Sequence, residues 1–119
     1  MISIDTSQPE VIKKAVKAGA HIWNDVRALT KPHALETAAE LDIPVIIMHM
    51  RGEPTTMNQL DQYDDITLDV ISELQTRLDA ALNAGIKPEN IMIDPGFGFA
   101  KNAHQNLKLL KELYKLNEL

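Results

Sequence analysis

One sequence pattern occurs four times along the chain: a short apolar run, a polar turn, and then a stretch with helical periodicity. The apolar runs are residues 2–4, 21–23, 44–48 and 91–93. Near-continuous apolar strands that alternate with amphipathic helices predict a parallel sheet with right-handed crossover connections. The chain is therefore expected to have an α/β fold.

Local signals predict where the helices lie. They are expected from Ser7 to Gly19, from about Thr30 to before Pro44, from about Asp61 to Ala84, and after Asn102. Ser7 with Glu10 three residues later has the pattern of a capping box at the start of the first helix. Val11, Ala15 and Ala18 are expected to form the inner stripe of that helix.

The length of the chain predicts how the sheet is completed. Four units in 119 residues average about 30 residues each, and a (βα)8 barrel of roughly 240 residues contains twice as many. We therefore expect residues 1–119 to form one domain of parallel (βα) units, with four strands and four helices, that makes up about half of a TIM barrel. The alternative is a small doubly wound open sheet, which would normally have a fifth strand and helices on two faces.

Composition argues against several classes of partner. The net charge is −5, from 12 basic and 17 acidic residues spread along the chain, which argues against binding nucleic acid or an anionic membrane surface. No window approaches the roughly 18–20 consecutive apolar residues that cross a bilayer, and the start lacks a signal-peptide profile. A cytoplasmic location is expected. The chain has no cysteine, so disulfides, thiolate metal sites and thiol nucleophiles are excluded.

Residues 94–99 form the most informative motif, Asp-Pro-Gly-Phe-Gly-Phe, directly after an apolar run. Barrel enzymes present an acid to a ligand in this way, with a carboxylate at the carboxyl end of a buried strand. The proline and glycines favour a turn, which would leave Phe97 and Phe99 on a loop. The alternative is that Asp94 caps the next helix and that both rings lie in the core.

Polar residues also follow the other strands. Because parallel strands of a barrel deliver their last residues to one rim, these residues are expected to meet. The strand-end residues are Asp5, Asn24, Asp25, Met48, His49 and Asp94. Asp5 fits a helix cap and a functional role equally well, whereas Asp25 is expected to be structural and paired with Arg27. His49 is expected to be a packed, hydrogen-bonded histidine or part of a pocket wall, and not a general base.

Carboxylates with an amide suit a ligand that is rich in N–H donors or that becomes cationic. A zinc site is the competing use of such a rim. The four histidines show no pair at metal-ligand spacing, which disfavours it. Glycine-rich phosphate-binding motifs are also missing.

Four segments in order resemble the dihydropteroate synthase family, from near residue 2 to about residue 110. They are Ile4-Asp5-Thr6-Ser7, Asn24-Asp25, Met48-His49-Met50 with Gly52 and Pro54, and Asp94 to Phe99 with Lys101-Asn102. The resemblance implies a pterin-binding (βα)8 barrel of folate biosynthesis. That enzyme condenses 6-hydroxymethyl-7,8-dihydropterin pyrophosphate with p-aminobenzoate to 7,8-dihydropteroate and releases pyrophosphate.

The resemblance also implies roles for individual residues. Asp94 matches the aspartate that binds the N3 and 2-amino edge of the pterin, and Asn24 matches the asparagine that contacts the same ring. Asp5 matches the aspartate that stabilises positive charge as pyrophosphate leaves, so Asp5 and Asp94 are the expected catalytic residues. The remaining matches place Met48, Val26 and Phe97 against the pterin, and Phe99 and Gly98 on the p-aminobenzoate side.

The chain resembles units three to six of the eight in such a barrel. The family's pyrophosphate-binding loops and its Ser-Arg-Lys strand have no counterpart here, so the chain alone is expected to be weakly active or inactive. The resemblance implies Mg2+ with the pyrophosphate substrate, with its protein ligand outside this chain, and a homodimer is expected. The alternatives are a pterin-binding domain of a methyltetrahydrofolate corrinoid methyltransferase and a non-catalytic structural fragment.

Overall fold

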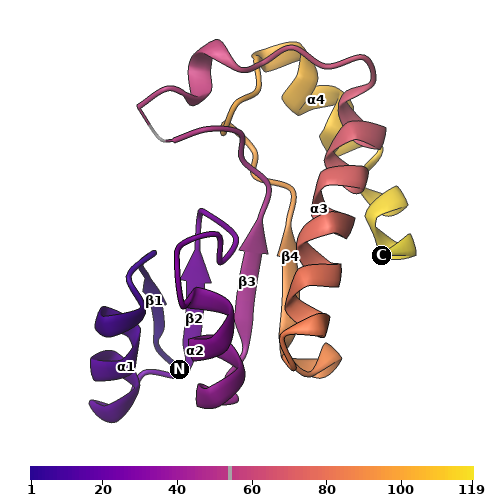
Figure 1. The fold of residues 1–119 in the computed structure, drawn as a ribbon. Helices are drawn as coiled ribbons and strands as arrows, with labels where there is room; N and C mark the ends of the chain where they lie inside the picture. The colour runs from indigo at the N-terminus through magenta and orange to yellow at the C-terminus, as the bar shows by residue number, and fades with distance from the viewer. Residues whose placement is uncertain (54) are drawn as a thin grey trace.

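The computed structural model describes residues 1–53 and 55–119, and its four strands form one parallel sheet (Figure 1). The strands are β1 (Ser3–Asp5), β2 (Ile22–Asp25), β3 (Val45–Met48) and β4 (Ile91–Asp94). They lie side by side in the order in which they occur along the chain. A doubly wound sheet would reverse this order at its switch point, so the expected α/β fold of barrel type is confirmed. Pro54 of the sequence motif lies outside the described residues.

In the described part of the chain, four α-helices follow the strands. They are α1 (Pro9–Lys17), α2 (Ala34–Leu41), α3 (Ile66–Asn83) and α4 (Ala103–Lys111). Three short 3-10 helices lie at Met57–Gln59, Pro88–Asn90 and Leu113–Glu118. None of the helices in the described part of the chain is both long and apolar enough to cross a membrane.

Side-chain caps explain two helix starts. The Asp65 carboxylate accepts hydrogen bonds from the backbone N–H groups of Thr67 and Leu68, so α3 begins at Ile66 and not near residue 61. Helix α4 begins after Asn102 as expected, because Asn102 and Gln105 form a reciprocal capping box.

Two expectations for α1 are wrong. Ser7 does not cap the helix, because its hydroxyl donates to the buried carboxylate of Asp25. The N-cap residue is Gln8, whose side chain makes no cap hydrogen bond. The inner stripe is also wrong, since Ile12 is fully buried while Val11 is 47% exposed. A tertiary contact of Ser7 therefore replaces the local cap.

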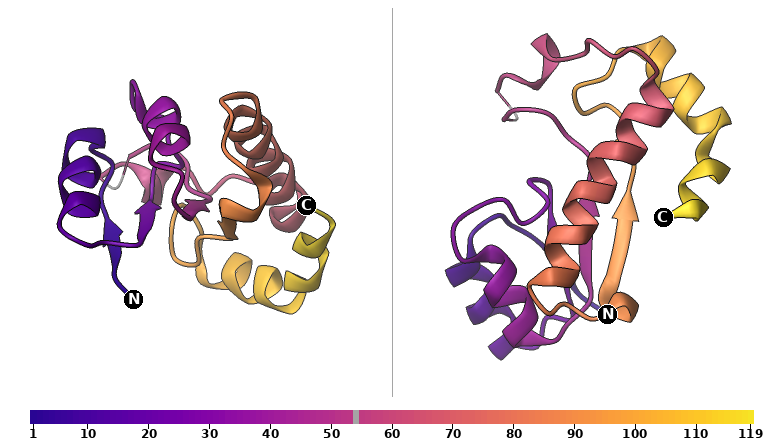
Figure 2. Two further views of the ribbon diagram at one scale, coloured as in Figure 1. Left: turned by 90° about the horizontal axis from the view of Figure 1, so that it is seen from below. Right: turned by 45° about the vertical axis from the view of Figure 1, so that its right-hand side comes forward.

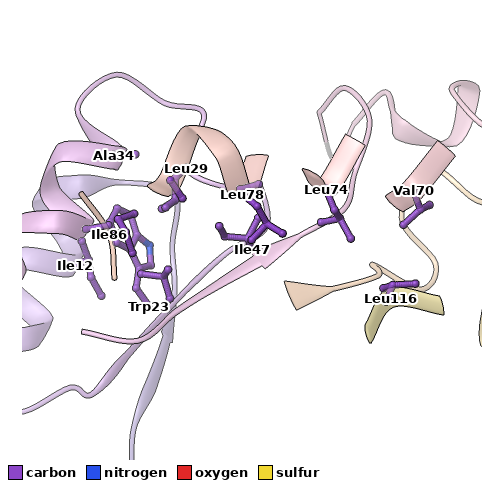
Figure 3. Packing of buried hydrophobic residues seen from close by; sticks show 14 of the residues in the cluster. Ile12, Trp23, Leu29, Ala34, Ile47, Val70, Leu74, Leu78, Ile86 and Leu116 are labelled. Atoms are coloured by element: carbon purple, nitrogen blue, oxygen red, sulfur yellow. The ribbon is translucent and has the colours of Figure 1, made fainter. Parts of the chain in front are cut away.

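The hydrophobic core lies between one face of the sheet and helices α1, α2 and α3, which follow one another around that face (Figure 2). Figure 3 shows how the side chains of these layers meet. The core includes Ile12 of α1, Ala34 and Ala38 of α2, Trp23, Val45 and Ile47 of the sheet, and Val70, Leu74 and Leu78 of α3. The indole N–H of Trp23 donates to the carbonyl oxygen of Thr6 at 2.7 Å, so this large buried ring leaves no polar atom unpaired.

The opposite face of the sheet, which we call the open face, carries the strand-end residues. Asp5 is level with Asn24, Asn24 with Ile46, and Met48 with Asp94. Because side chains alternate along a strand, all of these residues point away from the core. The open face is thus the surface on which a ligand can meet residues from all four strands.

Candidate active site

Asp5, Asn24 and Asp94 lie on the open face, at the carboxyl ends of β1, β2 and β4. Asp5 and Asn24 are paired directly across two strands. Asp94 lies two residues beyond the level of Asn24 on the same face, because it pairs with Met48, whereas Asn24 pairs with Ile46. Asp5 is exposed, and the other two are half-buried. The fold therefore brings two carboxylates and an amide from distant parts of the sequence to one surface.

The carboxamide of Asn24 has an acceptor without a partner. Its Oδ1 atom is buried and accepts no hydrogen bond from the described residues. Buried acceptors in native proteins are nearly always paired, and an orphan costs about 1–3 kcal/mol. An N–H donor of a ligand on the open face would satisfy this oxygen.

Asp94 organises the turn that follows it. Its Oδ1 accepts a hydrogen bond from the backbone N–H of Gly96 at 2.8 Å. The turn of residues 95–99, which we call the aromatic turn, carries Phe97 at 39% exposure and a half-buried Phe99. Asp94 does not cap α4, and the two rings do not lie in the core, so the alternative reading of this motif is wrong.

Val26 and Met48 contribute to one cavity of about 150 Å³ beside the carboxyl ends of β2 and β3. Met48 is buried, whereas Val26 is half-buried. The remaining lining comes from Arg27, Ala28, Thr30, His49, Met50, Glu73, Leu74 and Arg77. The two residues matched to the pterin slot thus share a wall of one hollow at this rim.

Asp25 is structural and paired with Arg27, as expected, but the pairing uses the backbone N–H of Arg27 and not its side chain. Its fully buried carboxylate accepts hydrogen bonds from the Ser7 hydroxyl and from the backbone N–H groups of Arg27 and Leu29, at 2.9 and 3.0 Å. The guanidinium of Arg27 pairs with Glu53. Asp25 therefore fixes the loop that leaves β2.

A buried polar network, which the sequence did not reveal, lies beneath the aromatic turn. Lys101 is only 8% exposed, and its Nζ lies 2.9 Å from His49 Nδ1. His49 Nε2 lies 2.8 Å from an Oε atom of Glu73, and that carboxylate also binds the guanidinium of Arg51. The only sequence signals were a lysine two residues after the aromatic turn and a histidine between two methionines.

The environment of this network shifts two pKa values. Burial, followed by the positive charge of Lys101, lowers the pKa of His49 from 6.5 to about 4. Burial lowers the pKa of Lys101 from 10.5 to about 8. At neutral pH the imidazole is therefore neutral, with Nε2–H donating to Glu73 and Nδ1 accepting from the ammonium group. His49 is a packed, hydrogen-bonded histidine, as its sequence context indicates.

Acid should destabilise the chain through His49. Between pH 6.5 and about 4 the unfolded chain binds a proton at His49 that the folded chain does not, so stability falls as the pH falls through this window. The loss due to His49 should be roughly 3 kcal/mol. Urea unfolding at pH 7 and pH 4, compared between the wild type and His49→Gln, measures it. The exposed His104→Gln variant should keep the wild-type pH dependence, and an unchanged dependence in His49→Gln would contradict the assignment.

The described residues do not form a metal centre. Among residues 1–53 and 55–119, no group of three or more histidine, aspartate or glutamate side chains is arranged to hold a metal ion. The described residues therefore offer no ready-made cage for a metal ion, and the chemistry derived below places none on them.

Known proteins resemble this chain over nearly its whole length. A sequence profile described as pterin binding enzyme matches residues 1–119. A dihydropteroate synthase of Escherichia coli strain K12 is 48% identical over 112 residues, which cover 94% of this chain and 40% of that protein.

Solved structures agree with the sequence comparison. The Xanthomonas albilineans dihydropteroate synthase in complex with 7,8-dihydropteroate superposes with a TM-score of 0.87 at 45% identity, over 98% of this chain and 41% of that one. The Yersinia pestis enzyme in a sulfonamide drug complex superposes with a TM-score of 0.94 at 42% identity, over 98% and 42% of the two chains. The chain thus spans about 40% of the length of the relatives that it matches.

Proposed function

The chain belongs to the pterin-binding enzyme family, and on this premise we propose that its open face is the pterin-binding part of a dihydropteroate synthase. The reaction would condense 6-hydroxymethyl-7,8-dihydropterin pyrophosphate with p-aminobenzoate and release pyrophosphate. The observation that carries the proposal is the meeting of Asp5, Asn24 and Asp94 on one sheet face, where Asn24 presents a buried acceptor without a partner.

The chemistry of the three side chains suits a pterin. The ring edge offers adjacent N–H donors, and a carboxylate accepts such donors in strong, charge-assisted hydrogen bonds. Asp94 keeps Oδ2 for this purpose, because Oδ1 is used by Gly96. Asn24 Oδ1 would accept a further N–H of the same ring.

The proposed reaction needs no covalent nucleophile from the protein. Departure of pyrophosphate leaves positive charge on the pterin, and the Asp5 carboxylate on the same face would stabilise that charge. The aryl amine then attacks the carbon from which pyrophosphate has left, and the proton that its nitrogen loses passes to pyrophosphate or to water. The half-buried Phe99, with Gly98, would border the p-aminobenzoate side, and Phe97, Met48 and Val26 would border the pterin.

Calorimetric titration with 6-hydroxymethylpterin tests the site. The wild-type chain should bind, and Asp94→Asn should lose roughly tenfold to hundredfold in affinity, because one acceptor of a charge-assisted pair is replaced by an amide. Asp79→Asn, at an exposed position of α3, is the matched control and should bind like the wild type. Equal heats for Asp94→Asn and the wild type would instead favour the non-catalytic structural fragment.

The whole reaction is proposed for the polypeptide that carries this chain, because the chain spans only about 40% of its relatives. Little or no synthase turnover is expected from the 119 residues alone. Turnover by the purified chain at the rate of its relatives would contradict that expectation. The homodimer stays a prediction.

A further inference from the structure

Lys101 is buried beneath the aromatic turn with all of its donors used. Its ammonium group donates to His49 Nδ1 at 2.9 Å, to the carbonyl oxygen of Gly96 at 2.9 Å and to that of Phe99 at 2.8 Å. An ammonium group has three N–H donors, so none remains for a substrate. Lys101 can therefore act on a ligand only through the groups that it holds.

Those groups are the two ends of the turn. The carbonyls of Gly96 and Phe99 flank Phe97 and Gly98, and one nitrogen atom binds both of them. The middle of the turn is held separately, because the N–H of Gly98 donates to Asn106 of α4 at 2.8 Å. These contacts fix the backbone on both sides of Phe97, in the turn that follows Asp94.

The other side of Lys101 is anchored to the neighbouring strand and helix. His49 follows β3, and its imidazole Nε2 is hydrogen-bonded to the carboxylate of Glu73 of α3 at 2.8 Å. The guanidinium of Arg51 binds the same carboxylate and lies 3.8 Å from the centre of the Tyr63 ring. The aromatic turn is thus tied to β3 and α3 by charge-assisted hydrogen bonds.

We propose that Lys101 is a positioning residue of the pterin site, which fixes the aromatic turn to the end of β3 through His49 and Glu73. This inference rests on the proposed function, since it assigns the turn as a wall of that site. Burying an ammonium group is unfavourable compared with an apolar side chain of similar length. Removing the ammonium group would also leave its three acceptors without a donor, so the effect on the pterin site is measured in a variant that is still folded.

Lys101→Met in the polypeptide that carries this chain separates the two effects. The variant keeps the length of the side chain and removes the charge and the three donors. We expect its urea midpoint to fall, because His49 Nδ1 and the carbonyl oxygens of Gly96 and Phe99 lose their donor. In the absence of urea, where the variant is still folded, its affinity for 6-hydroxymethylpterin should fall roughly tenfold to hundredfold because the wall is no longer held in place. Lys111→Met, an exposed position of α4, is the matched control and should change neither quantity.

A second measurement does not depend on the ligand. In ¹H–¹⁵N spectra, Lys101→Met should shift and broaden the amide signals of Gly96, Gly98 and Phe99, and the ¹⁵N signals of the His49 imidazole should move as Nδ1 loses its donor. A substitution that merely removed packing would leave the imidazole signals in place. Should Lys101→Met fail to fold, Lys101→Arg keeps the charge but cannot point three donors from one atom, so it should lose pterin affinity to a similar extent.

The outcomes distinguish the two proposals. Failure of the wild-type polypeptide to bind the pterin would refute the proposed function. Wild-type affinity in Lys101→Met or Lys101→Arg, with a wild-type spectrum of the turn, would overturn only the positioning role.

Discussion

Gly96→Ala should destabilise the chain by about 2–5 kcal/mol, because it combines backbone strain of about 1–2 kcal/mol with overpacking of about 1–3 kcal/mol. Gly96 has φ +70°, in the left-handed region that side chains disfavour. A Cβ atom built there would lie 1.9 Å from the carbonyl oxygen of His49, which is backbone and cannot rotate away. Relief requires the aromatic turn to move off β3. Urea unfolding measures the loss, and pterin binding should fall with it.

Gly98→Ala is the matched control for this prediction. Gly98 also has positive φ, at +82°, but a Cβ atom there would have nothing within 4 Å. Only the strain remains, so the cost should be about 1 kcal/mol. Equal losses in the two variants would show that the approach of the turn to His49 does not matter.

Hydrophobic pattern was sufficient to predict the strands and their common edge. Apolar runs bounded by turn residues identified all four strands, and parallel pairing then required their carboxyl ends to meet. The convergence of Asp5, Asn24 and Asp94 on one face follows from register, which alternation along each strand determines. These features depend on sequence-local signals repeated along the chain.

Features that depend on tertiary contacts could not be predicted in this way. Ser7 has the local sequence of a helix cap, but its hydroxyl binds Asp25, which comes from a different strand. Lys101 has the local sequence of a surface lysine beside a turn, although its nitrogen lies against His49, which follows β3 and is 52 positions away. Local sequence cannot predict either hydrogen-bond partner, because tertiary hydrogen bonds override the conformational preference of the local sequence.

The two faces of the sheet give aspartates opposite roles. Asp25 points toward the helices, where its buried carboxylate accepts hydrogen bonds from the Ser7 hydroxyl and from two backbone N–H groups. Asp5 is exposed on the open face. A carboxylate on the helix side can only stabilise the fold, whereas one on the open face is available to a ligand. Position within the alternation of a strand therefore separates structural from functional acids at the same rim.

Asp25→Ala should accordingly cost about 3–5 kcal/mol of stability, since it leaves several buried donors without an acceptor. The Ser7 hydroxyl and the backbone N–H of Leu29 would lose the carboxylate that they share. The loop after β2 also contains Ala28 at φ +51° and Leu29 at φ +60°. Left-handed residues persist only where neighbours hold them, so the loop should rearrange. Urea unfolding and the amide signals of the loop report both effects.

Asp5→Ala, the same substitution on the adjacent strand, is its counterpart. Asp5 is exposed on the open face, so stability should change by less than about 0.5 kcal/mol. Its effect should appear instead in turnover by the polypeptide that carries this chain, because charge develops on the ligand beside it only in the transition state. A large loss of stability in Asp5→Ala, or none in Asp25→Ala, would contradict the division of roles between the two faces.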